Sequence, residues 1–284
     1  MKKHKQKQHT KKAVKTTENE QNRFSLGNDI LEAALKTKTS SLKVLNLYHF
    51  FPDKLNLYGD RGNIISLVKR CEWRGIKLNV IEVSKTDGLS LDDMDMFFIG
   101  GGSDREQSLA TDELQKIKGK LKQKIENGVP GLTICGGYQF LGKDYIDANG
   151  NRLETLGILD FSTVAKQPRL IGNVLIKSEK FGDIVGFENH GGRTYHSFDT
   201  LGNVEKGNGN DDESNQEGLL YRNLIGTYLH GPILPKNPTI ADFLIEKAIE
   251  HRFSAQAAHD WMTALDNKLE NQARNSVWQR VKNG

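Results

Sequence analysis

The stretch from Val129 to Leu141 constrains the fold more than any other part of the chain. Its first half is apolar and rich in residues that favour a buried strand. Cys135 follows, then two glycines, then residues that can open a helix. A strand that turns sharply into a helix exposes the side chain at the turn and aims helix N–H groups at it, which favours a thiolate. The pattern predicts a cysteine nucleophile at a strand–helix corner. The alternative from the residues alone is a buried structural cysteine.

Strand and helix patterns alternate before this corner. Residues 42–50, 77–83 and 94–99 are predicted strands, and residues 63–74 and 112–126 are predicted amphipathic helices. Such an alternation is typical of an α/β fold with a mostly parallel central sheet and helices on both faces. Ligands bind such sheets at the carboxyl ends of the strands, which is where the cysteine falls.

The character of the chain changes after Leu141. Short predicted strands, which we expect to form an antiparallel extension of the same sheet, are 156–165, 169–177, 184–188, 219–222 and 225–228. The polar, Gly- and Asn-rich segment 203–217 reads as a mobile loop. Helical patterns return at 239–251 and 257–281, and the second of these is open to packing on the domain, contacting a partner or fraying.

Composition bounds the class of protein. The chain has 284 residues, 36% of them hydrophobic, so it can bury a proper core. A mean hydropathy of -0.58 and the lack of a long apolar run argue against a transmembrane helix, and the polar, basic first residues argue against a signal peptide. Two cysteines, Cys71 and Cys135, are too few for a disulfide framework, so we expect a reducing, cytoplasmic setting. Cys71 sits on the apolar face of a predicted helix and reads as a core residue.

The net charge of +4 comes from a lysine-rich N-terminus and does not indicate a nucleic-acid-binding face. Three parts follow along the chain: a disordered basic tail at residues 1–41, one α/β domain at 42–252 and a C-terminal helical extension at 253–284.

A glycine triplet, Gly100 to Gly102, follows the predicted strand 94–99 and allows a ligand to approach the backbone closely. The triplet lacks the Lys-Ser/Thr of a P-loop and the spacing of a dinucleotide fingerprint, so a phosphate-binding loop is the weaker interpretation.

The string Cys135-Gly136-Gly137-Tyr138-Gln139 fits the Cys-x-Gly-x-Gln corner of class I glutamine amidotransferases. From about residue 42 to 250 the chain resembles their cobyric acid synthase-like branch and, within it, the GatD family of glutaminase subunits. The resemblance implies a class I amidotransferase (flavodoxin-like) fold with Cys135 as nucleophile. It also implies an oxyanion hole made by the N–H of Gly101 or Gly102 together with that of Gly136, with each donor contributing roughly 3–4 kcal/mol.

A second motif, Gly226-Thr227-Tyr228-Leu229-His230-Gly231-Pro232, places a histidine at the end of a predicted strand. Its context matches the family, and an imidazole beside a thiol activates the thiol and protonates the leaving ammonia. Many class I amidotransferases have a glutamate two residues after this histidine, but this chain has Pro232 there. The triad therefore reads as incomplete within the chain, and the resemblance implies that a partner subunit supplies an aspartate.

The resemblance also assigns substrate-binding residues. Arg169 matches the arginine that holds the substrate carboxylate, and Asn189 and Gly191 match the pocket segment that receives the amino and carboxylate ends of glutamine. Gln139 completes this set. From the residues alone, a solvated turn arginine and a strand-to-turn transition remain open as alternatives.

The implied activity is glutamine hydrolysis coupled to ligation. In this family the ammonia passes to MurT, a Mur-ligase-like partner in a heterodimer, which uses ATP and Mg to amidate the D-glutamate α-carboxylate of lipid II during peptidoglycan synthesis. This chain itself has no ATP motif, and we expect no cofactor or metal in it. We expect it in the cytoplasm, brought to the inner face of the membrane through lipid II. The alternatives are a cobyrinate-type amidotransferase, a stand-alone γ-glutamyl cysteine hydrolase and a non-catalytic binding module.

Overall fold

The computed structural model describes residues 42–56, 59–102 and 104–284, so the expected tail lies outside the described residues. Its central sheet is parallel except for one edge strand. In spatial order its strands are β11 (Leu219–Tyr221), β12 (Leu224–Thr227), β4 (Gly131–Ile134), β3 (Met96–Ile99), β1 (Val44–Phe50) and β2 (Lys77–Val83). The edge strand β11 pairs with β12 in the antiparallel direction and is the antiparallel extension of this sheet.

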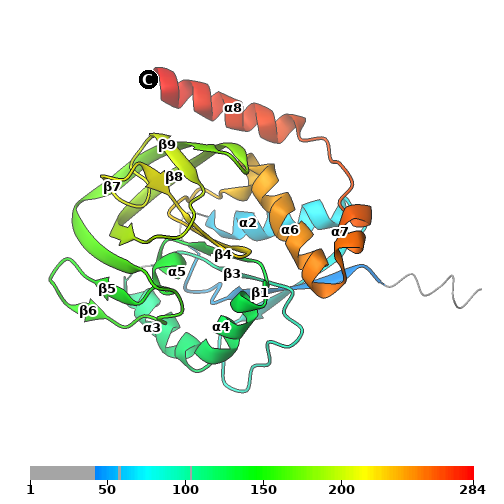
Figure 1. Ribbon diagram of the computed structural model, residues 1–284, viewed down its shortest axis with the longest axis horizontal. Coiled ribbons are helices and arrows are strands. Elements are labelled where there is room, and N and C mark those ends of the chain that lie inside the picture. Colours follow the sequence, from blue (N-terminus) through cyan, green and yellow to red (C-terminus); the bar gives the residue numbers. More distant parts are fainter. Residues whose placement is uncertain (1–41, 57–58, 103) are drawn as a thin grey trace, which may run out of the picture. The chain divides into compact units, whose positions relative to one another are not determined.

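Helices lie on both faces of this sheet (Figure 1). One face carries α2 (Arg61–Glu72) and α6 (Pro238–Arg252), and the other carries α3 (Asp104–Gln115) and α4 (Lys118–Glu126). This arrangement confirms the predicted α/β class. A glycine ends α2. Gly75 has φ +68°, and the N–H of Ile76 then donates back to the Cys71 carbonyl at 2.9 Å.

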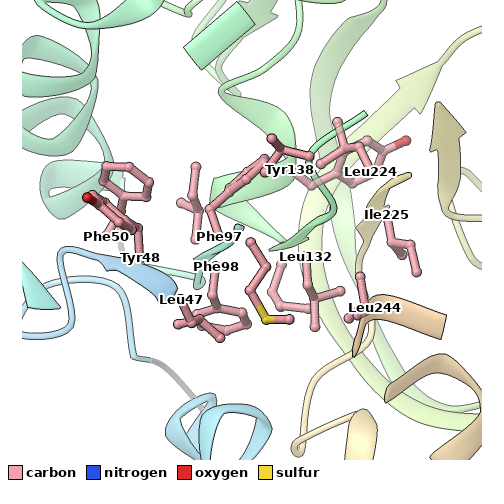
Figure 2. Close-up of a cluster of buried hydrophobic side chains, with 14 of the residues drawn as sticks. Leu47, Tyr48, Phe50, Phe97, Phe98, Leu132, Tyr138, Leu224, Ile225 and Leu244 are labelled. Carbon is pink, nitrogen blue, oxygen red and sulfur yellow. The ribbon is translucent and has the colours of Figure 1, made fainter. Parts of the chain in front are cut away.

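Side chains of the central strands alternate between the two faces and fill the core (Figure 2). Phe97 and Phe98 are adjacent in β3, yet Phe97 lies toward Tyr138 while Phe98 lies beside Leu47. All four side chains are buried, at 0 to 2% exposure. Each fully buried side chain of this kind stabilises the fold by about 1.5–3 kcal/mol. The core thereby holds the carboxyl ends of β1, β3, β4 and β12 in one fixed edge.

The remaining strands form a second sheet rather than a continuation of the first, which differs from the single extended sheet expected for them. Its members are β5 (Asp144–Ile146), β6 (Arg152–Leu153), β7 (Ser162–Ser178), β8 (Gly182–Tyr195), β9 (Gly202–Lys206) and β10 (Gln216–Glu217). Strand β7 is seventeen residues long and pairs with β8 over most of its length. The expected strand 169–177 and the second half of the expected strand 156–165 fall in β7, because β7 begins at Ser162 and runs through the polar residues 166–169 as one strand.

The segment 203–217, expected to be a loop, is strand only at its ends, in β9 and β10, and residues 207–215 connect these strands through turns and bends. Its turn is tied down by Glu188, whose carboxylate accepts the N–H of Asn208 and of Gly209, each at 2.9 Å. Backbone groups of this connecting loop therefore satisfy the buried carboxylate of Glu188.

Two predicted helices are each split into two. The pattern at 112–126 becomes α3 and α4, because Ile117 is buried at the break and its N–H bonds Leu114 O at 3.1 Å in a tight last turn. The pattern at 257–281 becomes α7 (Ala255–Trp261) and α8 (Lys268–Asn283). Helix α8 packs on the second sheet, where Trp278 joins a buried cluster with Leu175 and Val185. Over the described ranges, none of the helices is long and apolar enough to cross a membrane.

Candidate active site

Cys135 lies at the corner between β4 and α5 (Gly136–Gln139), with a backbone φ of +50° and ψ of −106°. Residues other than glycine rarely adopt such backbone angles, so the corner is strained, as nucleophile elbows are. Two hydrogen bonds hold it, from Cys135 N to Thr227 O at 2.8 Å and from Gln139 N to Cys135 O at 2.9 Å. Gly137 is required here, because a Cβ on it would lie 2.6 Å from Ile99 O.

His230 follows β12 and reaches Cys135, as the sequence predicted. The residue is 1% exposed, and its backbone pairs with Phe187 of β8 through hydrogen bonds of 2.7 and 3.3 Å. Burial alone lowers the pKa of His230, but the neighbouring Asp60 carboxylate and Cys135 thiol raise it to about 10. The imidazole is therefore protonated at neutral pH and lies beside the Cys135 side chain, in the arrangement of a nucleophile and its acid–base partner.

Asp60 corrects the expectation that the chain lacks an acid beside its histidine. Its carboxylate is fully buried, and Oδ1 lies 3.6 Å from His230 Nδ1. It immediately precedes α2 and lies far from both motifs in the sequence. Pro232, the position where the family often carries the acid, instead packs against Gly62, which has no room for a Cβ.

The same carboxylate also accepts a hydrogen bond from a predicted oxyanion-hole donor. The N–H of Gly101 donates to Asp60 Oδ2 at 2.8 Å. A Cβ built on Gly101 would lie 2.8 Å from His230 Cε1 and 3.4 Å from Cys135 Cβ, so this backbone borders the reacting groups. Asp60 thus joins the glycine loop and the histidine in one cluster.

The other two oxyanion glycines face Gln107. Its side chain donates from Nε2 to Gly102 O at 2.9 Å, and a Cβ on Gly136 would collide with it. Gln107, 5% exposed, therefore fixes the glycine loop against the start of α5. Gln107 is not among the predicted site residues, because nothing in its local sequence distinguishes it from the other polar residues of α3.

Arg169 and Asn189 meet on the second sheet. Arg169 donates from Nε to Asn189 Oδ1 at 3.1 Å and from Nη2 to Asn189 O at 2.8 Å. A Cβ on Gly191 would lie 3.6 Å from Arg169 Nη1, so the three predicted pocket residues are neighbours. Arg169 is exposed, as a group that receives a soluble anion should be.

Gln139, the last residue of α5, lies in a buried hydrogen-bond network. Its Nε2 donates to the Tyr228 hydroxyl at 3.0 Å, and that hydroxyl bonds Thr194 Oγ1 at 2.6 Å. His190 stacks on the Tyr228 ring with centroids 3.6 Å apart, which makes it a neighbour of this network. Strand β8 connects this network with the cluster around His230. It pairs with His230 at Phe187 and passes Gln139 at Gly192.

Among the residues that the structure describes, no group of three or more His, Cys, Asp and Glu side chains is placed to hold a metal. Cys71, the other cysteine, is buried in the core, and burial raises its pKa to about 12. Its thiol is therefore inert at neutral pH.

Residues 46–238 match the family described as the CobB/CobQ-like glutamine amidotransferase domain. The chain is 58% identical, over 84% of its length and 96% of the relative's, to the lipid II isoglutaminyl synthase (glutamine-hydrolyzing) subunit GatD of Staphylococcus aureus (strain N315). It is 40% identical, over 74% of its length and 82% of the relative's, to the subunit of the same name from Streptococcus pneumoniae (strain ATCC BAA-255 / R6). A crystal structure of a glutamine amidotransferase superimposes with a TM-score of 0.50 at 15% identity, covering 72% of this chain and 98% of that one, and bears on the fold alone.

Proposed function

The chain belongs to the CobB/CobQ-like glutamine amidotransferase family, and we propose that it is the glutamine-hydrolysing subunit of a lipid II isoglutaminyl synthase. It converts L-glutamine to glutamate and ammonia. The observation that carries this proposal is the contact between Cys135 and His230 at the carboxyl edge of the parallel sheet. The two curated relatives with this name lend the substrate context.

In the first half of the reaction, Cys135 Sγ attacks the side-chain amide carbon of glutamine. The carbonyl electron pair moves to oxygen, and the His230 imidazolium protonates the amide nitrogen as the C–N bond breaks. Ammonia leaves, and a γ-glutamyl thioester remains on Cys135. In the second half, neutral His230 takes a proton from water, whose oxygen attacks the thioester and releases glutamate and the thiolate.

The oxyanion receives the N–H groups of Gly136 and of Gly101 or Gly102. Because the Gly101 N–H donates to Asp60, that carboxylate has to release or share it as the oxyanion forms. Asp60 also orients His230 and stabilises its charged form across the 3.6 Å separation. Arg169 binds the glutamine carboxylate, and Asn189 and Gly191 complete the pocket, with Gln139 supporting it from behind.

Ligation belongs to a partner in this proposal. A MurT-like Mur ligase subunit forms a heterodimer with this chain, holds ATP and Mg, and activates the D-glutamate α-carboxylate of the lipid II stem peptide. Ammonia from Cys135 attacks that activated group and yields D-isoglutamine. The chain acts in the cytoplasm and meets the membrane only through lipid II.

The test measures ammonia and glutamate released from glutamine by the purified chain, with and without the MurT-like subunit. We expect release that depends on Cys135, is lost in Cys135→Ala and rises sharply with the partner. Cys71→Ala is the matched control, because it removes a buried thiol outside the site. Strong release without a partner would instead indicate a stand-alone hydrolase, and no release by the folded complex would indicate a binding module.

A further inference from the structure

Strands β7 and β8 separate at the predicted substrate pocket. The ladder pairs Ala165 with Gly192 and resumes with Leu170 opposite His190. Four residues of β7, Lys166 to Arg169, therefore face Gly191 alone. We call these four residues the β7 bulge. A bulge of this size leaves backbone carbonyls without partners in the ladder.

Arg193 satisfies these carbonyls from inside the sheet. Its side chain is fully buried, and its guanidinium donates to Pro168 O at 2.8 Å, to Lys166 O at 3.3 Å and to Gly191 O at 2.8 Å. Two of these acceptors lie in the β7 bulge and the third lies directly opposite it. The fork of a guanidinium is suited to such a set, because it presents several donors in one rigid plane.

The charge of Arg193 pairs with the carboxylate of Asp212, whose Oδ2 lies 3.3 Å from Nη2. The hydrogen bond and charge of Arg193 hold the pKa of Asp212 below its usual range. Asp212 is itself 40% exposed, so it compensates the buried cation only in part. Burying the charge of Arg193 costs free energy, because its partners are three carbonyls and one half-exposed carboxylate. What this arrangement fixes is the conformation of the β7 bulge.

The β7 bulge ends in Arg169, whose own guanidinium donates to Asn189. We propose that Arg193 is a positioning residue that sets Arg169 at the place where the glutamine carboxylate binds. This proposal rests on the proposed function, since it takes glutamine as the ligand of Arg169. Arg193 touches no reacting atom, so it acts on the binding of substrate and not on the chemical step.

The experiment compares Arg193→Gln, Arg169→Gln and the double variant in glutamine hydrolysis by the assembled complex. Losing the charged hydrogen bonds that shape the β7 bulge should raise the KM for glutamine by about 10- to 100-fold and change kcat by less than about threefold. The KM of the double variant should be no higher than that of Arg169→Gln, because both substitutions disable the same carboxylate-binding group. A fall in the kcat of Arg193→Gln at unchanged KM would overturn the proposal. So would a double variant whose KM rises by the product of the two single effects.

A substrate without the carboxylate gives a second readout. For 4-aminobutanamide, which has the amide and no α-carboxylate, Arg193→Gln and wild type should have equal kcat/KM. If Arg193 had only a structural role, Arg193→Gln would lower kcat/KM for both substrates by the same factor. The matched control is Arg70→Gln, since Arg70 is another buried arginine, paired with Asp242 on α6, and its loss should lower stability without changing KM.

Two further measurements cover the remaining outcomes. If Arg193→Gln does not fold, Arg193→Lys keeps the charge but cannot span the three carbonyls, and its KM should lie between those of wild type and Arg169→Gln. Titration calorimetry of glutamine on Cys135→Ala measures binding without hydrolysis. A weaker Kd in Cys135→Ala/Arg193→Gln supports the proposal even if wild type proves unable to hydrolyse glutamine, which would defeat only the proposed function. An unchanged Kd, or no glutamine binding at all, overturns the role of Arg193.

Discussion

Replacing Asp60 with asparagine removes one negative charge beside His230 and keeps the shape of the side chain. The carboxylate oxygen Oδ1 lies 3.6 Å from His230 Nδ1 in the folded protein. At an effective dielectric constant of about 20, a charge pair at this separation is worth about 5 kcal/mol as an upper bound. Hydrogen bonds to charged groups measured by substitution are worth about 1.5–3 kcal/mol. These values correspond to a fall of about 1 to 3 units in the pKa of His230.

The direction of the effect follows from the charge. The folded-state pKa of His230 is raised to about 10, so the imidazolium form is present at neutral pH and is lost as pH rises through that value. Stabilisation of the folded state by this pair is full below the unfolded pKa and is lost across the same rise. In Asp60→Asn the pKa is lower, so both activity and stabilisation should be lost at a lower pH.

The assay is the pH profile of kcat/KM for glutamine in the assembled complex. For wild type we expect an alkaline limb near pH 10, and for Asp60→Asn a limb shifted down by about 1 to 3 units. Asp53→Asn is the control, because that acid lies in the same loop and contacts Ser84 instead, at 3.4 Å. An alkaline limb that stays in place in Asp60→Asn would refute a role for Asp60 in holding the charge of His230.

The remaining predictions concern the glycine loop, a buried acid and the last helix. Gly101→Ala places a Cβ 2.8 Å from His230 Cε1, so we expect kcat to fall by about 100-fold or more with thermal stability nearly retained. Burial raises the pKa of Glu217 to about 7, so wild type should lose on the order of 3 kcal/mol of unfolding free energy as pH rises from about 4.5 to 7, and urea titrations of Glu217→Gln should not show this loss. Trp278→Ala should cost about 3 kcal/mol in the same urea assay, because the ring fills the contact between α8 and the second sheet.

Local motifs made much of the central fold predictable. The corner at Cys135 and the strand before His230 are short, strongly patterned segments, and the predicted strand 77–83 coincides with β2. Their meeting followed from the rule that parallel strands present their carboxyl ends at one edge. The choice of His230 as the partner of Cys135 came from the family motif around it, and the rule then placed the two residues together.

Other features depend on contacts between distant residues. Asp60 precedes an ordinary amphipathic helix, and only the packing of α2 beside the glycine loop brings its carboxylate to His230. The break at Ile117 reflects tertiary burial, which outweighs the continuous helical pattern around it. The β7 bulge and Arg193 were also hidden, because strand register cannot be read from a polar string.

The central claim is that Cys135 is the nucleophile that attacks the side-chain carbonyl of glutamine. The most direct measurement treats the assembled complex with a glutamine analogue that carries a diazoketone in place of the amide, and locates the label by peptide mass spectrometry. We expect one label per chain, on Cys135 and not on the buried Cys71, with protection by glutamine. Cys135→Ser should remain unlabelled. A label on another residue, or labelling of Cys135 that glutamine does not slow, would contradict the account.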